Sequence, residues 1–165
     1  MKTILYLAMT PNGYIAREND ETPWSNEEWE HFSTVAKRVG NLIVGRKTFE
    51  IMSKDGDFQE LGNPFTLVLS KQENDDPKFI NSPEQAITLL KEKGFSEALV
   101  IGGGMTNSSF VQSGFVDEIH LDIEPFLFGK GVKLFADADF DLNLKLLKIK
   151  KISENTVQLQ YKILK

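Results

Sequence analysis

Cysteine is absent from this 165-residue sequence, which also holds only two histidines and no long apolar run. Without cysteine, the chain can form no disulfide bond, no thiolate metal site and no cysteine nucleophile. No stretch approaches the ~20 apolar residues of a membrane-spanning helix, and no secretory signal pattern follows Met1. The two histidines, His31 and His120, form no metal or triad pattern, so we expect both at the surface. These absences predict a cytoplasmic protein with no metal site and no membrane partner.

Positive charge is also in deficit, because 19 lysines and arginines stand against 24 aspartates and glutamates, for a net charge of −5. We therefore expect no nucleic-acid partner. A chain of this length forms one domain that buries about 70% of the surface its unfolded form exposes. The sequence shows no repeat and no linker, so residues 1–165 are expected to form a single domain. A solvated strand face is expected for the C-terminal lysines that alternate with apolar residues: Lys145, Lys148, Lys150 and Lys151.

Strand and helix patterns alternate along most of the chain. Runs rich in β-branched residues predict strands at 3–9, 41–45, 65–69, 98–101 and 116–124, and a closing antiparallel hairpin at 144–152 and 156–164. Helices are predicted between the early strands, and a polar loop is expected to begin at Tyr14. This order predicts a three-layer α/β/α fold around a mixed, mostly parallel sheet with a C-terminal antiparallel hairpin.

One acidic residue faces inward on the first predicted helix. Residues 25–28 form a capping box, in which Ser25 begins the helix and the side chain of Glu28 can reach back to it. At ~100° per residue, Glu28 also lies within about 45° of the centre of the apolar stripe. An inward carboxyl group is either desolvated, with a raised pKa, or paired. The sequence leaves two roles for Glu28, a capping residue or a proton donor that faces a cleft, and the capping role is the simpler one.

Three groups suited to anion binding follow the carboxyl ends of predicted strands. One is a run of three glycines before a helix, where the backbone can approach a phosphate closely, although a tight turn alone can also require glycine. The second carries two cations at a predicted helix start, where they are unfavourable unless an anion shares the site. The third places a hydroxyl group and a cation just past the end of a strand. Together they predict a phosphorylated ligand at this edge of the sheet. The groups are 102–104 (GGG), 46–48 (RKT) and 70–71 (SK).

Five motifs, in this order, resemble the dihydrofolate reductase superfamily. The last is closest to the reductase domain at the C-terminus of bifunctional riboflavin-biosynthesis deaminase-reductases and to its stand-alone relatives. The resemblance implies a dihydrofolate reductase-like fold and an NADPH-dependent reductase that passes hydride to a pterin, a dihydrofolate-like ring or a ribosylaminopyrimidine such as 5-amino-6-(5-phosphoribosylamino)uracil. The motifs are Pro23-Trp24 before an acid-bearing helix, 44–50 (VGRKTFE), Leu69-Ser70, 100–104 (VIGGG), and 116–121 (VDEIHL) followed by 125–135 (PFLFGKGVKLF).

The resemblance also implies which residues contact the cofactor. The helix start after 41–45 would hold the pyrophosphate and the adenosine 2′-phosphate, and the glycine turn would cradle the pyrophosphate. Ser70 and Lys71 would lie near the adenosine, and Ala8 and Ile15 would flank the nicotinamide. The implied NADPH-binding residues are Ala8, Ile15, Gly45, Arg46, Lys47, Thr48, Ser70, Lys71, Gly102, Gly103, Gly104, Met105 and Thr106.

Two acids are the candidates for catalysis. In dihydrofolate reductases the substrate-binding acid lies five residues after the tryptophan of the Pro-Trp pair, which here falls on Trp29, so our candidate is Glu28, one residue earlier. Asp122 stands where folate reductases place a strand threonine, and it is either a second carboxylate of the site or an exposed strand residue. Met105 and Asn107 replace an arginine and a tyrosine that are common in the superfamily.

Two functions follow from these observations. The first is an NADPH-dependent reductase of a small heterocyclic substrate. The alternative is an NADP(H)-binding protein without efficient catalysis, because the expected acid is displaced by one position. Relatives in this branch commonly pair through their sheets, so the resemblance also implies a homodimer.

Overall fold

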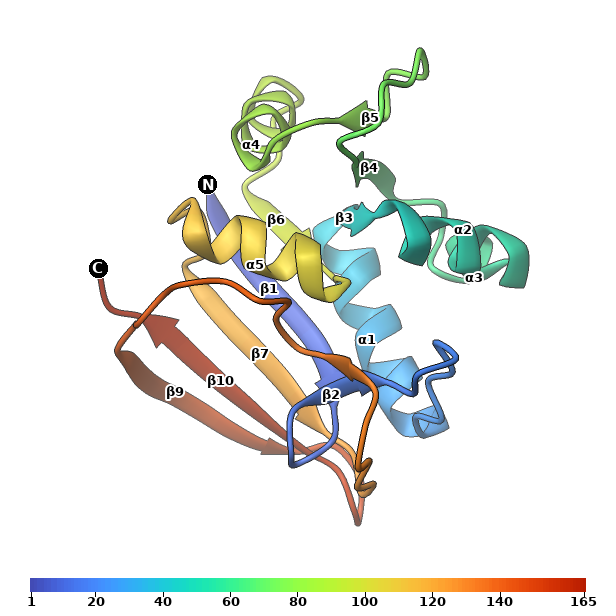
Figure 1. The fold of residues 1–165 in the computed structure, drawn as a ribbon, viewed down its shortest axis with the longest axis vertical. Helices are drawn as coiled ribbons and strands as arrows, with labels where there is room; N and C mark the ends of the chain where they lie inside the picture. Colours follow the sequence, from blue (N-terminus) through green and yellow to red (C-terminus); the bar gives the residue numbers. More distant parts are fainter.

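An eight-stranded mixed sheet forms the centre of the computed structural model, which describes residues 1–165 (Figure 1). The strand order is β5–β4–β3–β6–β1–β7–β10–β9. All neighbours from β5 to β7 are parallel, whereas β10 runs antiparallel to both β7 and β9. The predicted mostly parallel sheet with a closing antiparallel hairpin is therefore confirmed. The bounds are β1 (Lys2–Met9), β3 (Asn41–Gly45), β4 (Phe65–Leu69), β5 (Phe79–Ile80), β6 (Glu97–Val100), β7 (Glu118–Ile123), β9 (Leu144–Lys151) and β10 (Val157–Ile163).

The sheet separates two apolar cores, because successive side chains of a strand point to opposite faces. From β1, Ile4 belongs to a core shared with Phe32 of α1, whereas Leu5 belongs to a second core shared with Phe110 of α5. Helices thus cover both faces, and the three-layer α/β/α prediction is confirmed. The helices are α1 (Asn26–Val39), α2 (Arg46–Asp55), α3 (Asp57–Glu60), α4 (Pro83–Glu92) and α5 (Gly104–Gln112).

A second, two-stranded sheet was not predicted. It pairs β2 (Tyr14–Ala16) with β8 (Val132–Lys133) in antiparallel fashion, so the expectation that a loop begins at Tyr14 is wrong. Strands of two or three residues are too short to show a periodic pattern, and this pairing joins segments far apart in the chain. Glycine at position 131, just before β8, allows the two strands to lie this close, because a Cβ atom there would lie only 2.4 Å from the Ala16 carbonyl oxygen.

Local signals set the ends of the main helices correctly. Ser25 and Ser82 cap α1 and α4 by accepting hydrogen bonds from the backbone N–H groups of Glu28 and Gln85. Gly40 ends α1 in the left-handed conformation, with φ at 76°, which glycine adopts without strain. None of the five helices combines the length and apolar character needed to cross a bilayer.

Candidate active site

Two helix N-termini without side-chain caps meet beside the glycine turn. α2 begins after Gly45 and α5 begins after Gly103, and neither start has a capping side chain or an acidic residue in its first turn. The Gly45 N–H donates to the Gly102 carbonyl oxygen at 2.7 Å, which holds the two starts side by side. α1 and α4, in contrast, carry both a serine cap and an acid. Free N–H groups and two positive dipole ends therefore converge on one place.

The glycines of this turn differ in what limits them. A Cβ atom at Gly45 would lie 2.7 Å from Thr106 Oγ1, and one at Gly104 would lie 2.8 Å from the Lys133 carbonyl oxygen. At Gly103 the nearest atom would be Thr48 Oγ1, at 3.7 Å, which is an ordinary contact. Packing within the protein therefore explains glycine at 45 and 104, but it does not explain glycine at 103.

Cationic side chains surround these helix starts. Arg46 and Lys47 are exposed in the first turn of α2, where Lys47 pairs with Asp20 at 2.7 Å. Arg46 contacts the side-chain oxygen of Gln72, whose backbone N–H donates to Ser70 Oγ at 3.1 Å. The structure thus brings Arg46 and Ser70 together through Gln72, a residue that the sequence did not single out.

Of the remaining residues predicted to bind the cofactor, some are buried and others are exposed. Met105 is 72% exposed at the start of α5, whereas Thr106 is buried against Gly45. Lys71 is exposed just beyond β4. Ala8 and Ile15 are both buried, and Ala8 lies opposite Asp122 across the β1–β7 pairing.

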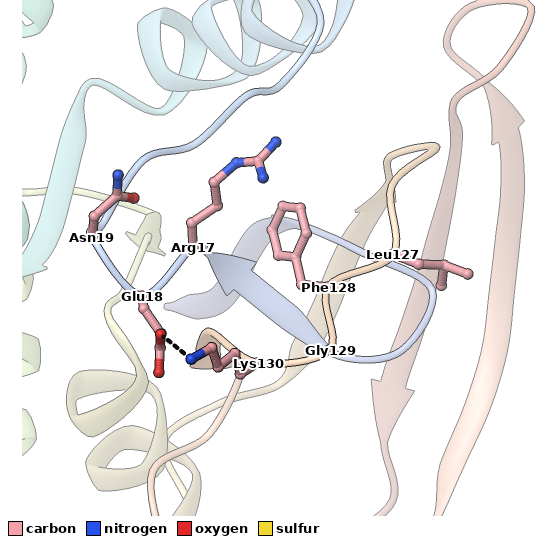
Figure 2. Close-up of a pocket in the computed structure, with 7 residues that line it drawn as sticks. All are labelled: Arg17, Glu18, Asn19, Leu127, Phe128, Gly129 and Lys130. Atoms are coloured by element: carbon pink, nitrogen blue, oxygen red, sulfur yellow. Dashed lines mark ion pairs between the residues drawn. The ribbon is translucent and has the colours of Figure 1, made fainter.

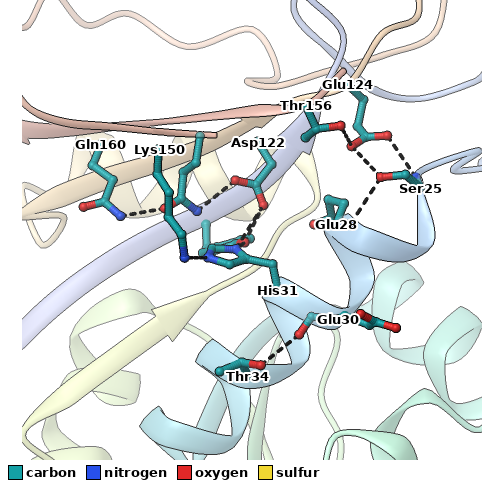
Figure 3. A network of polar contacts seen from close by, with 12 residues as sticks. Ser25, Glu28, Glu30, His31, Thr34, Asp122, Glu124, Lys150, Thr156 and Gln160 are labelled. Atoms are coloured by element: carbon teal, nitrogen blue, oxygen red, sulfur yellow. Dashed lines mark hydrogen bonds and ion pairs between the residues drawn. The ribbon is translucent and has the colours of Figure 1, made fainter. Parts of the chain in front are cut away.

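Three buried carboxyl groups gather between α1 and β7, as Figure 3 shows. Glu124, on the residue after β7, accepts hydrogen bonds from the Ser25 N–H at 2.9 Å, from the Ser25 hydroxyl at 3.0 Å and from the Thr156 hydroxyl at 2.8 Å. The sequence assigned the return contact of the capping box to Glu28, and that is wrong: Glu124 takes the Ser25 N–H instead. This partner lies 99 residues along the chain, beyond the reach of a local rule.

Glu28 is consequently free of the capping role and turned inward, as its place on the helical stripe predicts. Its side chain is 5% exposed. Burial, reinforced by the charges of Asp122 and Glu124, raises the pKa of Glu28 to about 8. At neutral pH Glu28 therefore holds a proton in the interior, which is the state required of a general acid.

Asp122 is the second carboxyl group of this cluster. It is fully buried, so the interpretation of Asp122 as an exposed strand residue is wrong. Its Oδ1 accepts from the Gln158 side-chain amide at 2.8 Å, and its Oδ2 accepts from the Tyr6 hydroxyl. Burial raises the pKa of Asp122, but these two donors favour its charged form, whereas the contact with Asp122 favours the protonated form of Glu28.

The histidines do not both lie at the surface. His120 is buried and bonds to Glu118 at 3.0 Å, so its predicted surface position is wrong. His31 is partly exposed, and its Nδ1 lies 2.8 Å from the Tyr6 hydroxyl oxygen. Sequence reasoning also missed Tyr6, because a tyrosine within an apolar strand looks like any other core residue.

An open depression of about 440 Å³ lies beside the end of β2 (Figure 2). The Arg17 guanidinium stands 4.8 Å from the Phe128 ring centroid, and Glu18 pairs with Lys130 at 3.1 Å. Phe128 also stacks on Trp24, with ring centroids 6.0 Å apart, which anchors the loop before α1. None of the predicted site residues lines this depression, whose lining is Arg17, Glu18, Asn19, Leu127, Phe128, Gly129 and Lys130.

Known proteins that resemble this chain match it along nearly its whole length. Residues 1–158 match the family model described as the RibD C-terminal domain. A Caenorhabditis elegans protein provisionally named as a dihydrofolate reductase is 28% identical, over 93% of this chain and 82% of its own. The structure of a Shewanella sp. PV-4 protein, provisionally named a riboflavin biosynthesis protein, is 26% identical with a TM-score of 0.78 over 100% of both chains.

A two-activity protein shares the fold across part of its length. It is the diaminohydroxyphosphoribosylaminopyrimidine deaminase/5-amino-6-(5-phosphoribosylamino)uracil reductase of Thermotoga maritima. The match covers 99% of this chain and 56% of that one, with a TM-score of 0.75 and 18% identity. At this identity the likeness shows the fold.

Proposed function

The chain belongs to the RibD C-terminal domain family, and because proteins similar to it are named as reductases, we propose that it is a cytoplasmic, NADPH-dependent reductase. The observation that carries the proposal is the meeting of an anion site and an acid pair at one sheet edge. Gly45, Gly102, Ala8 and Asp122 lie at or near the carboxyl ends of β3, β6, β1 and β7, which are neighbouring parallel strands. Ligands bind outside these ends in open α/β sheets.

The residues present fit NADPH. The uncapped starts of α2 and α5 suit the pyrophosphate, and Gly103 leaves space there that packing within the protein does not fill. Arg46, Lys47 and Lys71 supply cations for a 2′-phosphate, while Ala8 and Ile15 would line the nicotinamide end. When bound, the cofactor supplies the hydride.

The acid pair supplies the proton. Glu28 holds a proton at neutral pH and would donate it to a ring nitrogen or oxygen of the substrate. Asp122 beside it would stay charged, and the two carboxyl groups thus divide the roles of acid and electrostatic partner. We propose that the substrate is a flat heterocycle. It is either a pterin or dihydrofolate-like ring, or a compound similar to 5-amino-6-(5-phosphoribosylamino)uracil.

Loss of NADPH absorbance with each of these substrates tests the reductase proposal. We expect turnover with one of them that depends on enzyme concentration. Tight NADPH binding without turnover of any would contradict the reductase and favour a protein that binds the cofactor without catalysis.

Replacing Arg46 with glutamine should weaken NADPH binding by about 10-fold and leave NADH binding unchanged, because the guanidinium would pair only with the 2′-phosphate. Calorimetric titration of both nucleotides measures this. Lys54→Gln, in the last turn of the same helix, is the matched control and should change neither affinity. An equal loss for both nucleotides would place Arg46 away from the 2′-phosphate.

We also propose that two copies of the chain pair through β9. This edge strand is exposed along its whole length, on its apolar as well as its lysine side. The lysines were expected in solvent, but the exposed apolar residues were not. An unpaired edge that carries them favours a partner strand. The apolar residues, 43–60% exposed, are Leu144, Leu146, Leu147 and Ile149.

Size-exclusion chromatography with light scattering should therefore give the parent chain about twice its 18.7 kDa mass. Ile149→Lys should produce a folded monomer, because a buried lysine in the interface would lack a partner. Lys148→Ala, at the adjacent position, should remain a dimer. A monomeric parent would contradict the proposed pairing.

A further inference from the structure

A line of hydrogen bonds runs from the surface to Asp122, the carboxyl group that neighbours Glu28 in the buried acid pair. Lys150 Nζ, on β9, lies 2.9 Å from His31 Nε2, on α1. His31 Nδ1 lies 2.8 Å from the Tyr6 hydroxyl oxygen, and that hydroxyl donates to Asp122 Oδ2. Figure 3 shows Lys150, His31 and Asp122 following one another toward Glu28. Four separate elements contribute to this line, so it is a product of the tertiary fold.

The chemistry of the groups fixes the direction of each bond. The single hydrogen of the Tyr6 hydroxyl goes to Asp122, so its oxygen must accept from His31 Nδ1–H. A neutral imidazole that donates through Nδ1 accepts at Nε2, where the Lys150 ammonium is a donor. Burial and the charge of Lys150 lower the pKa of His31, which keeps the ring neutral. Every donor in the line therefore points inward, toward Asp122.

The other oxygen of Asp122 is already engaged. Its Oδ1 accepts from the Gln158 amide at 2.8 Å, and Gln158 in turn accepts from the Gln160 amide at 2.6 Å. Amide groups cannot carry a proton at neutral pH, so this second branch only orients the carboxylate. The route for a proton is the branch through Oδ2.

We propose that Lys150, His31 and Tyr6 form a proton relay that returns a proton to Glu28, through Asp122, after each reduction. The inference rests on the proposed function, because it supplies the proton which that reaction consumes. Glu28 is left as a carboxylate when it has protonated the substrate. Tyr6 then gives its proton to Asp122 as it accepts one from His31 Nδ1, and His31 takes one at Nε2 from the Lys150 ammonium.

The balance closes at both ends. Asp122 passes its new proton to Glu28, and water reprotonates the Lys150 amine, so one proton has moved from solvent to Glu28 and only N–H and O–H bonds have changed. Rotation of the Tyr6 hydroxyl and tautomer exchange at His31, which is partly exposed, restore the starting arrangement. Tyr6 remains a phenol throughout, since burial and the charge of Asp122 raise its pKa.

Tyr6→Phe tests the relay, because it keeps the ring packed on Phe32 and removes only the hydroxyl. We expect kcat to fall by about 10–100-fold, which is less than the loss of about 10²–10⁴-fold typical of removing a direct general acid. The affinity for NADPH should be unchanged. Tyr161→Phe on β10 is the matched control and should keep the parental kcat. Parental turnover in Tyr6→Phe would overturn the relay.

His31→Ala separates proton transfer from a structural role. Its kcat should fall by a similar factor and recover when imidazole is added to the solution, because free imidazole can fill the vacated place and carry the proton. Lys150→Met should shift the pH dependence of kcat, whereas Lys148→Met should not. Loss of activity in His31→Ala that imidazole fails to restore would show that the ring only positions Tyr6, and it would overturn the relay.

A measurement that needs no turnover keeps the relay separate from the proposed reduction. Nitrogen-15 NMR of the parent protein should show His31 neutral at pH 7 with its proton on Nδ1. Tyr6→Phe should release this preference. A proton on Nε2 in the parent would overturn the relay whether or not the protein reduces a substrate, whereas an inactive parent with the Nδ1 tautomer would count against the reductase proposal alone.

Discussion

Gly103→Val should reduce the affinity for NADPH by about 100-fold or more, equivalent to a loss of ~2.7 kcal/mol, while the protein stays folded. The backbone at Gly103 is extended, with φ at −77° and ψ at −161°, which any residue adopts. An added Cβ would make only an ordinary contact, 3.7 Å from Thr48 Oγ1. The branched side chain would instead stand between the two uncapped helix starts, where the pyrophosphate must approach the backbone.

Calorimetry and thermal unfolding together read out this variant. Loss of glycine at the N-cap of α5 costs on the order of 1 kcal/mol, which a domain with ~5–15 kcal/mol of stability survives. Gly129→Val is the matched control, since a Cβ there would meet nothing within 4 Å, and it should bind NADPH as the parent does. Parental affinity in folded Gly103→Val would remove the glycine turn from the cofactor site.

Glu28→Gln should lower kcat by about 10²–10⁴-fold and leave NADPH binding intact. The amide has the shape of a protonated carboxyl group but has no proton to release. Glu27→Gln, at the preceding and exposed position of the same helix, should keep parental kinetics. An unchanged kcat in Glu28→Gln would assign the proton donor elsewhere.

The pH dependence of Glu28 gives a second test of the same residue. Because the acid must be protonated to act, the parental kcat should fall as the pH rises through about 8, the pKa of Glu28. The pKa of Glu28 rises from its usual value of 4.5 to about 8 in the folded state. Between pH 4.5 and pH 8 the folded state therefore keeps a proton that the unfolded chain has released, so rising pH favours unfolding. Glu28→Gln removes this penalty.

Denaturant unfolding should therefore find the two proteins similar at pH 4 and the variant more stable at pH 8. The expected gain is on the order of 2–4 kcal/mol, at about 1.4 kcal/mol for each pH unit. Glu27→Gln should show no such pH-dependent gain. A variant that is less stable than the parent at pH 8 would mean that the carboxyl group of Glu28 is ionised and paired.

Local rules predicted the elements that depend on neighbouring residues. Serine caps, glycine stops and apolar periodicity placed α1, α4 and the long strands, and the helical angle placed Glu28 inward. Counting along the chain from the Pro-Trp pair pointed instead to Trp29, which the structure places toward the surface with its Nε1 3.1 Å from Glu60. The angle around a helix was the better guide because burial follows the face of the helix.

Contacts between distant segments were beyond such rules. Glu124 took the place at Ser25 that the capping box assigned to Glu28, and β2 found its partner in β8. Asp122 left two interpretations open, because an alternating strand shows which residues share a face but not what covers that face. Here α1 covers the face that carries Asp122, and Tyr6 and His31 complete a polar cluster that no sequence motif predicts.

Calorimetric titration of the parent protein with NADPH, with NADH as the comparison, tests the central proposal most directly. Tight binding with a clear preference for NADPH is the predicted result, because the helix starts at Gly45 and Gly103 would hold the pyrophosphate and Arg46 and Lys71 would distinguish the 2′-phosphate. Absence of binding by either nucleotide would contradict the reductase and leave only the fold.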